Sequence, residues 1–169
     1  MGFRMRRLAT PLVVILVALV LGTAPADAES STALNRDVSG PFVGTTFFDF
    51  FTNGCSFIHQ ALDGTYATAK GGSGFFHLDV CPTFGVDNGS VDVGTFSLHD
   101  PLGSTLDGTV TGVYDTTVPT SIRFEFTLRV VSGTRRFRHA HGTVTLTGTW
   151  EFVSITSPIF GTLVGSLKP

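Results

Sequence analysis

The densest group of residues able to do chemistry lies in the segment TRRFRHAH. It contains Arg135, Arg136, Arg138, His139 and His141. Arginine offers forked donors that match carboxylates and phosphates, so the segment could bind an anionic head group. The alternative, which we favour, is a solvated turn whose charges keep a loop soluble. A metal site built on the two histidines would need a third ligand from elsewhere in the chain.

A second group, His59, His77 and Asp79, lies close to the cysteines in sequence. If two antiparallel strands place Cys55 opposite Cys81, the same register places His59 opposite His77. Such a pair could bind a metal ion or act in general acid/base chemistry, so these three residues are weak metal candidates. We favour the alternative of two hydrogen-bonded histidines beside a structural disulfide.

The cysteines, Cys55 and Cys81, are the only two in the chain. Two thiols in an oxidising compartment usually pair, and we expect a disulfide between them. Two metal-ligating cysteines are the less favoured alternative, because neither belongs to a C-x-x-C unit.

Standard catalytic signatures are missing from the sequence. It contains no G-x-S-x-G, no H-E-x-x-H and no phosphate-binding glycine loop. We therefore expect a binding protein rather than an enzyme, and no cofactor. An isomerase or cyclase that shapes a bound substrate is the alternative, and it would need a polar group such as His99 or Asp92 directed into a cavity.

The elements that must position these residues are β-strands. Alternation of apolar and polar residues is strongest over 121–131 and 142–152, and weaker strands are expected over 91–99, 104–114 and 159–167. Three earlier strands are expected from CSFIHQ, from GTYATAK after a turn at Asp63-Gly64, and from GFFHLDVC. Short turns throughout indicate an antiparallel meander, which is most stable when closed into a barrel. A two-sheet sandwich is the main rival.

Aromatic residues are more numerous than a narrow filled barrel easily accommodates, with 16 Phe in the chain. Core packing explains most of them. Others could line an apolar pocket at a barrel mouth, for which Trp150 and Tyr114 are candidate ligand-binding residues. Residues 42–51 carry Phe on both faces, which is typical of a covered strand, a bulge or a contact between subunits.

The N-terminus has the pattern of a secretory signal peptide over residues 1–28, with a basic start, a short apolar run and an Ala-Asp-Ala exit. An uncleaved anchor is the alternative. We expect a disordered leader over 29–40, one domain over 41–169, and a secreted, extracellular protein without membrane contact after cleavage. The full chain has a net charge of −2. The signal peptide carries three arginines and one aspartate, so its cleavage makes the chain more acidic, which argues against nucleic acid as a partner.

The segment VVSGTRRFRHAHG resembles the V-x-G-G-T-G-x-F-x-x-A-x-G pattern of the allene oxide cyclase and dirigent barrel superfamily, especially its small secreted actinobacterial members. The matching positions are Gly133, Thr134, Phe137, Ala140 and Gly142. Ser132 and Arg135 stand where the pattern has glycine. The resemblance implies an eight-stranded, antiparallel, up-and-down, calycin-like β-barrel whose relatives are often dimers or trimers. No functional residue of the superfamily can be aligned here, so none is transferred.

These observations together predict an exported, disulfide-stapled barrel that binds a small apolar or amphipathic molecule, with the Arg-His segment near one mouth. A homo-dimer or homo-trimer is a further expectation. The third functional class that we consider is an oligomeric extracellular structural or interaction protein.

Overall fold

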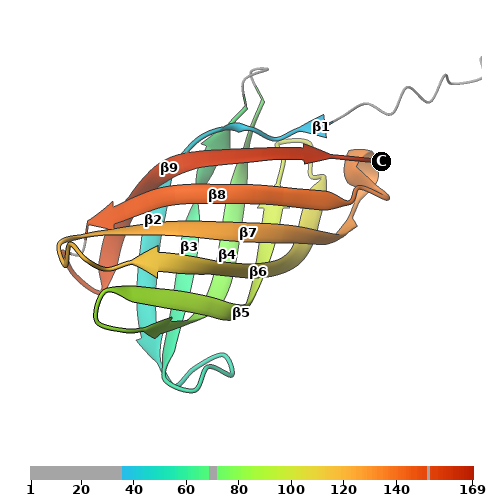
Figure 1. Cartoon of the computed structure of the whole chain (residues 1–169). Helices are drawn as coiled ribbons and strands as arrows, with labels where there is room; N and C mark the ends of the chain where they lie inside the picture. Colours follow the sequence, from blue (N-terminus) through green and yellow to red (C-terminus); the bar gives the residue numbers. More distant parts are fainter. Residues whose placement is uncertain (1–35, 69–71, 152) are drawn as a thin grey trace, which may run out of the picture. The chain divides into compact units, whose positions relative to one another are not determined.

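A computed structural model describes residues 36–68, 72–151 and 153–169, and most of them form β-strands (Figure 1). The strands are β1 (Arg36–Asp37), β2 (Gly40–Phe50), β3 (Ile58–Ala67), β4 (Ser73–Phe84), β5 (Asn88–His99), β6 (Thr105–Asp115), β7 (Ser121–Gly133), β8 (Gly142–Glu151) and β9 (Thr156–Leu167), with a 3-10 turn η1 (Arg135–Phe137) between β7 and β8. The expected signal peptide, residues 1–28, lies outside the described residues.

Strands β2 to β9 close into a barrel. Each pairs antiparallel with the next along the chain, and β9 pairs with both β8 and β2. The expected eight-stranded, up-and-down antiparallel barrel is therefore confirmed, and the sandwich alternative is excluded. Closure leaves no free edge among these eight strands, which removes the usual site of edge-to-edge aggregation.

The barrel interior follows the alternation visible in the sequence. On β7, Phe124, Phe126 and Leu128 point inward and are fully buried, while the intervening Glu125 and Thr127 face solvent. The other strands add aliphatic and aromatic side chains to the same continuous core. Glycine provides room for the largest of them. A Cβ at Gly148 would lie 2.6 Å from the Phe124 ring and 2.8 Å from the Phe42 ring.

Three sequence-based expectations about the first half of the barrel are wrong. Asp63-Gly64 is not a turn, because β3 runs through it as one strand and pairs Gly64 with Phe76. The register also differs, since Asp63 faces His77 and Ala61 faces Asp79. His59 is therefore not opposite His77. Ordered structure also begins earlier than Pro41, because β1 pairs with the end of β9.

Alternating strand directions give the barrel two distinct ends. One end, which we call the mouth, carries the connections 51–57, 85–87, 116–120 and 153–155. The opposite end, which we call the basic end, carries the connections 100–104 and 134–141 and the last residues of the chain. In Figure 1 the C-terminus lies beside the connection between β7 and β8, where His141 bridges to Lys168.

Candidate functional site: an apolar pocket at the mouth

A pocket of about 450 Å³ opens at the mouth of the barrel. All four mouth connections or their flanking strand ends contribute to its wall. The lining residues are Phe48, Phe50, Ile58, Phe84, Gly85, Val86, Thr116, Pro119, Ile122, Trp150 and Ile155. Within this lining, Thr116 and Trp150 are the residues with polar side-chain atoms, and none of the lining residues is ionisable. The site is therefore suited to an uncharged, mainly hydrocarbon molecule.

Trp150 is the aromatic centre of this site. It is 1% exposed and its ring packs against Phe48, Phe84 and Tyr114, with centroids 5.4 to 6.4 Å apart. Its indole N–H is buried and has no hydrogen-bond partner among the described residues. An unpaired buried donor costs stability, and such groups in native proteins call for an explanation. Of the candidate ligand-binding residues named from sequence, Trp150 alone lies in the pocket wall.

Tyr114 lies behind that wall, within a buried polar cluster of the barrel interior. Its hydroxyl donates to Gln60 Oε1 at 2.6 Å, and Gln60 Nε2 donates to Thr46 Oγ1 at 2.8 Å. Burial raises the pKa of Tyr114 well above its ordinary value, so the hydroxyl stays protonated and keeps donating. Tyr114 thus packs against Trp150 and Phe84 on the core side of the pocket wall. Its hydroxyl already has a hydrogen-bond partner inside the protein.

The polar groups proposed for a cyclase are not in this pocket. His99 is exposed on the outside of β5 and lies 2.9 Å from Ser97 Oγ, and Asp92 is exposed at the bulge of the same strand. Neither is directed into the cavity, which overturns the positions that the sequence suggested for an acid or base.

The connection 51–57 gives the mouth an aromatic rim. Phe57 packs edge-on against both Phe50 and Phe51, at 5.8 and 5.5 Å between centroids, and all three rings are more than half exposed. Phe50 also lines the pocket, so the rim is continuous with its wall. Phe51 and Asn53 both have positive φ, at 58° and 50°. Such values are uncommon for a bulky side chain and have to be imposed by the surrounding structure.

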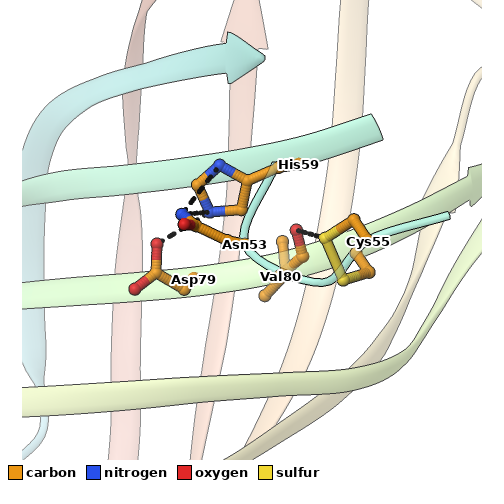
Figure 2. The surroundings of a disulfide bond; sticks show 6 residues. Asn53, Cys55, His59, Asp79 and Val80 are labelled. Carbon is orange, nitrogen blue, oxygen red and sulfur yellow. Dashed lines mark hydrogen bonds and ion pairs between the residues drawn. A yellow bond between two sulfur atoms is a disulfide. The ribbon is translucent and has the colours of Figure 1, made fainter. Parts of the chain in front are cut away.

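The disulfide expected from sequence imposes part of that structure. Cys55 and Cys81 are bonded, with a Cα–Cα distance of 5.3 Å, and join the 51–57 connection to β4 (Figure 2). Within the connection, the Phe51 backbone N–H donates to Phe57 O, and Cys55 N–H donates to Thr52 O. The alternative of two metal-ligating cysteines is excluded, and the bond fixes the aromatic rim to the barrel wall.

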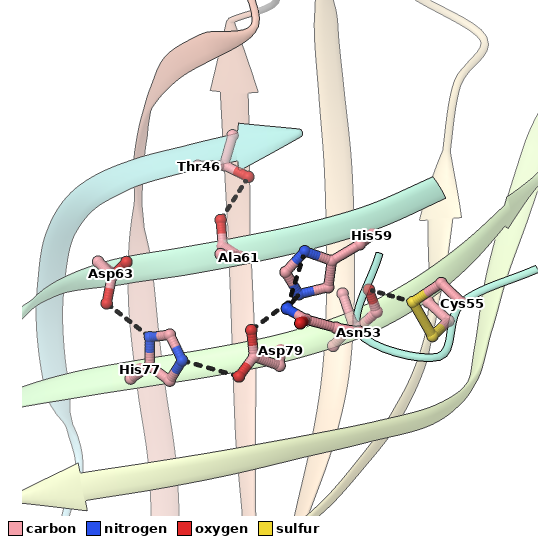
Figure 3. A network of polar contacts seen from close by, with 10 residues as sticks. Thr46, Asn53, Cys55, His59, Ala61, Asp63, His77 and Asp79 are labelled. Carbon is pink, nitrogen blue, oxygen red and sulfur yellow. Dashed lines mark hydrogen bonds and ion pairs between the residues drawn. A yellow bond between two sulfur atoms is a disulfide. The ribbon is translucent and has the colours of Figure 1, made fainter. Parts of the chain in front are cut away.

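The histidines and aspartates near the disulfide form a chain of polar contacts on the outside of β3 and β4 (Figure 3). His59 Nε2 lies 2.8 Å from Asp79 Oδ1, His77 Nε2 lies 2.8 Å from Asp79 Oδ2, and His77 Nδ1 lies 2.7 Å from Asp63 Oδ1. Asn53 from the rim connection reaches His59, with Nδ2 at 3.1 Å from Nε2. The structure therefore joins the three weak metal candidates and adds Asp63, which sequence reasoning missed.

This chain of contacts acts as a second fastening for the rim. No three His, Cys, Asp or Glu side chains among residues 36–68, 72–151 and 153–169 form a group suited to a metal ion.

The contacts of His77 define its protonation. An ionised carboxylate only accepts hydrogen bonds, so the two ring nitrogens of His77 that face carboxylates both donate, and His77 is an imidazolium in this arrangement. Partial burial lowers its pKa, but hydrogen bonds to Asp63 and Asp79 outweigh that effect and raise the pKa overall.

The same contacts have the opposite effect on Asp79. Desolvation acts to raise the pKa of this carboxyl, but hydrogen bonds from His77 and His59 lower it below the ordinary 3.8. The depressed pKa of Asp79 gives stability that is fully present above about pH 4. This stability is lost as the pH falls from there through the lowered pKa of the folded state. The raised pKa of His77 gives stability that is fully present below about pH 6.5, its ordinary pKa. This stability is lost as the pH rises from there through the raised pKa of the folded state.

These signs predict that the pair stabilises the protein most between about pH 5 and 6. Thermal unfolding of the wild type and of His77→Gln should therefore differ most in Tm at about pH 5.5, and the difference should shrink by about pH 8. Because both side chains are partly exposed, we expect a modest shift. A difference that grows from pH 5.5 to 8 would contradict the imidazolium assignment.

The Arg-His segment lies at the basic end, across the barrel from the pocket. It connects the end of β7 to the start of β8, whereas Ile122 and Trp150 in the pocket lie at the other ends of those strands. A strand of β7's length spans roughly 40 Å, so the segment cannot border this pocket. Two of its three arginines have partners within the fold. Arg135 Nη1 donates to the Leu102 carbonyl oxygen, and Arg136 Nε contacts Asp100 Oδ2.

Asp100 explains why one of these arginines is held. Its side chain is 1% exposed, and its Oδ1 accepts from the backbone N–H groups of Leu102 and Ser104, both at 2.8 Å. Burial works to raise the pKa of Asp100, but the Ser104 hydrogen bonds and the Arg136 charge hold it below its ordinary value. Arg136 also covers the Phe137 ring at 4.7 Å. The arginines thus fasten η1 onto the connection between β5 and β6.

The residues that matched the superfamily pattern have structural functions here. Phe137 is buried and closes the basic end, and Thr134 Oγ1 accepts from Thr105 N–H at 3.0 Å. Arg135, which stands where the pattern has glycine, has a φ of 48°, in the left-handed region that favours glycine. Arg138, His139 and His141 remain exposed at this end.

No helix within the described part of the chain is long and apolar enough to cross a membrane. Comparisons of the chain with protein-family models, curated proteins and solved structures give no match.

Sequence reasoning missed most of the pocket wall. Ile58, Val86, Pro119 and Ile155 lie at strand ends or in connections, where alternation no longer indicates which way a side chain points. Their apolar character was visible in the sequence. Apolar residues are unusual in turns, and here they occur in several connections at one barrel end.

Proposed function

We propose that this protein binds a small, uncharged, mainly apolar molecule in the pocket at the barrel mouth. The observation that carries the proposal is the cavity of about 450 Å³ with a wall of aliphatic and aromatic side chains. This volume falls within the range of about 300–1,000 Å³ that is typical of small-molecule sites. Deeper in the barrel, aliphatic and aromatic side chains pack into one continuous core, and the apolar cavity at the mouth supports this proposal.

The wall also defines the chemistry of the ligand. Without an ionisable side chain in the lining, a charged group would lose its hydration and gain no counter-charge. Thr116 offers the one hydroxyl of the lining, and it donates to Val86 O at 3.4 Å. We infer a ligand with at most one or two weakly polar groups, bound mainly by burial of hydrocarbon surface.

We also propose the type of protein and its location outside the cell. The segment 130–142 and the eight-stranded barrel support a protein of the allene oxide cyclase and dirigent type. The signal-peptide pattern over 1–28 and the Cys55–Cys81 bond support secretion.

Binding can be tested with the neutral fluorescent probe N-phenyl-1-naphthylamine. We expect saturable enhancement of its emission, with at least tenfold weaker binding to the Ile155→Arg variant, because Ile155 lines the pocket yet is 60% exposed and tolerates a polar replacement. The matched control is Val131→Arg, which is 69% exposed near the opposite end of β7. Equal binding by both variants would place the probe elsewhere.

A second candidate function is self-association through the outer face of β9, β2, β3 and β4. Val43 pairs with Phe160 on one side and with Thr65 on the other, and Thr65 pairs with Phe75. The Val43, Phe160 and Phe75 side chains are 48–63% exposed, and Phe47 on the same strand is 46% exposed. This row supports the expected homo-dimer or homo-trimer, and a monomeric mass in light scattering would rule it out.

A further inference from the structure

The connections at the barrel mouth present apolar side chains to solvent. Phe51 is 71% exposed, Val86 93%, Val118 51% and Val153 70%, and each comes from a different connection. Single exposed apolar residues are ordinary, but four separate connections with exposed apolar side chains at one end together form an apolar surface of the kind that marks an interaction site. At the basic end, by comparison, Leu102 stands beside a segment of arginines and histidines.

The charge distribution separates the two ends further. Asp87 is the single charged side chain within the described residues of the four mouth connections. The charged side chains on the adjoining strand ends are mostly carboxylates, namely Asp49, Asp115, Arg123 and Glu151. This end would therefore be repelled by an anionic surface and has no basic cluster to hold one.

The backbone of Phe51 is strained even though its side chain remains exposed to solvent. A left-handed backbone conformation is strained for a bulky residue, and here the side chain is not buried in return. The disulfide and the contacts of Asn53 with His59 hold the connection that carries it. The arrangement maintains an exposed aromatic side chain in a fixed place beside the pocket.

We propose that the mouth of the barrel docks onto a lipid surface with no net charge, inserting its apolar tips among the acyl chains. Separate protruding side chains around a hollow suit insertion into a fluid, whereas a flat continuous face would suit another protein. Two copies meeting mouth to mouth would both bring carboxylates, Asp87 and Asp115, to the shared interface, which disfavours that pairing. The docking departs from our expectation of no membrane contact, and it does not depend on whether the pocket is filled.

Flotation of the purified protein with phosphatidylcholine vesicles tests this docking. The test variant is Phe51→Asn, Val118→Asn and Val153→Asn combined, because none of the three lines the pocket and asparagine tolerates the left-handed conformation at position 51. We expect the wild type to float with the vesicles and the partition coefficient to fall at least tenfold in the variant. Leu102→Asn, at the basic end, should float like the wild type.

Three outcomes would overturn the docking. The first is a wild-type protein that does not float with neutral vesicles or floats only when anionic phosphatidylglycerol is added. The second is an equal loss in the Leu102→Asn control. The third is a concentration-dependent oligomer that the triple variant abolishes, which would make a second copy the occupant of this face. Probe binding by the triple variant should stay at the wild-type level, so failure of docking and failure of ligand binding are separately visible.

Discussion

The Trp150→Ala substitution is expected to lower the free energy of unfolding by about 3–5 kcal/mol. Trp150 is the largest fully buried side chain of the barrel and packs against aromatic rings from β2, β4, β6 and β7. Removing it leaves a cavity that the closed barrel cannot collapse, and it removes one wall of the pocket. Denaturant unfolding measures the loss of stability, and probe binding below the unfolding transition measures the loss of the site.

Trp150→Phe is the matched control for this prediction. It keeps an aromatic ring in place and removes the buried indole N–H that lacks a partner among the described residues. Loss of an unpaired donor offsets part of the lost packing, so we expect a cost below about 1.5 kcal/mol. If Trp150→Phe were as destabilising as Trp150→Ala, the indole N–H would have a partner that stabilises the fold.

Replacing both cysteines, as Cys55→Ser with Cys81→Ser, is expected to cost about 2–4 kcal/mol of unfolding free energy. The bond closes a loop over a sequence separation of 26 and ties the mouth connection 51–57 to β4. The variant should lose protection of backbone amides in this connection before the rest of the barrel opens, which hydrogen exchange can follow.

The matched control for the disulfide is the wild type measured with and without a thiol reductant. Reduction should lower stability to nearly the level of the double serine variant and leave that variant itself unchanged. A double variant as stable as the oxidised wild type would contradict the structural importance of the bond, and uniform loss of protection over all strands would contradict its local effect on the mouth.

The strands of the second half of the barrel were predictable because one face of each is buried and the other is wet. β6 to β9 carry the period-two pattern almost without interruption, so their bounds and inward faces follow from the sequence. Closure could be expected for the same reason, since a long meander with no protected edge is unstable when open. The disulfide followed from two cysteines in a chain with an export pattern.

The remaining features depend on tertiary packing that no local pattern records. Asp63-Gly64 has the composition of a turn, but Gly64 lies where the Phe76 ring crosses the strand, and the space it leaves keeps β3 continuous. The Arg-His segment has the composition of an anion site, yet Arg135 and Arg136 contact a turn that is distant in sequence. The pocket wall comes from strand ends and connections, where side-chain direction depends on the whole barrel.

The most direct test of ligand binding at the mouth uses Trp150, which is the chain's single tryptophan and lies in the pocket wall. Titration with a bromo-terminated straight-chain alcohol should quench its fluorescence, because a heavy atom in the pocket contacts the indole. We expect saturable quenching at one molecule per chain, weakened at least tenfold by Ile155→Arg and unchanged by Val131→Arg. Quenching that rises linearly without saturation, or that is equal in both variants, would contradict ligand binding at the mouth.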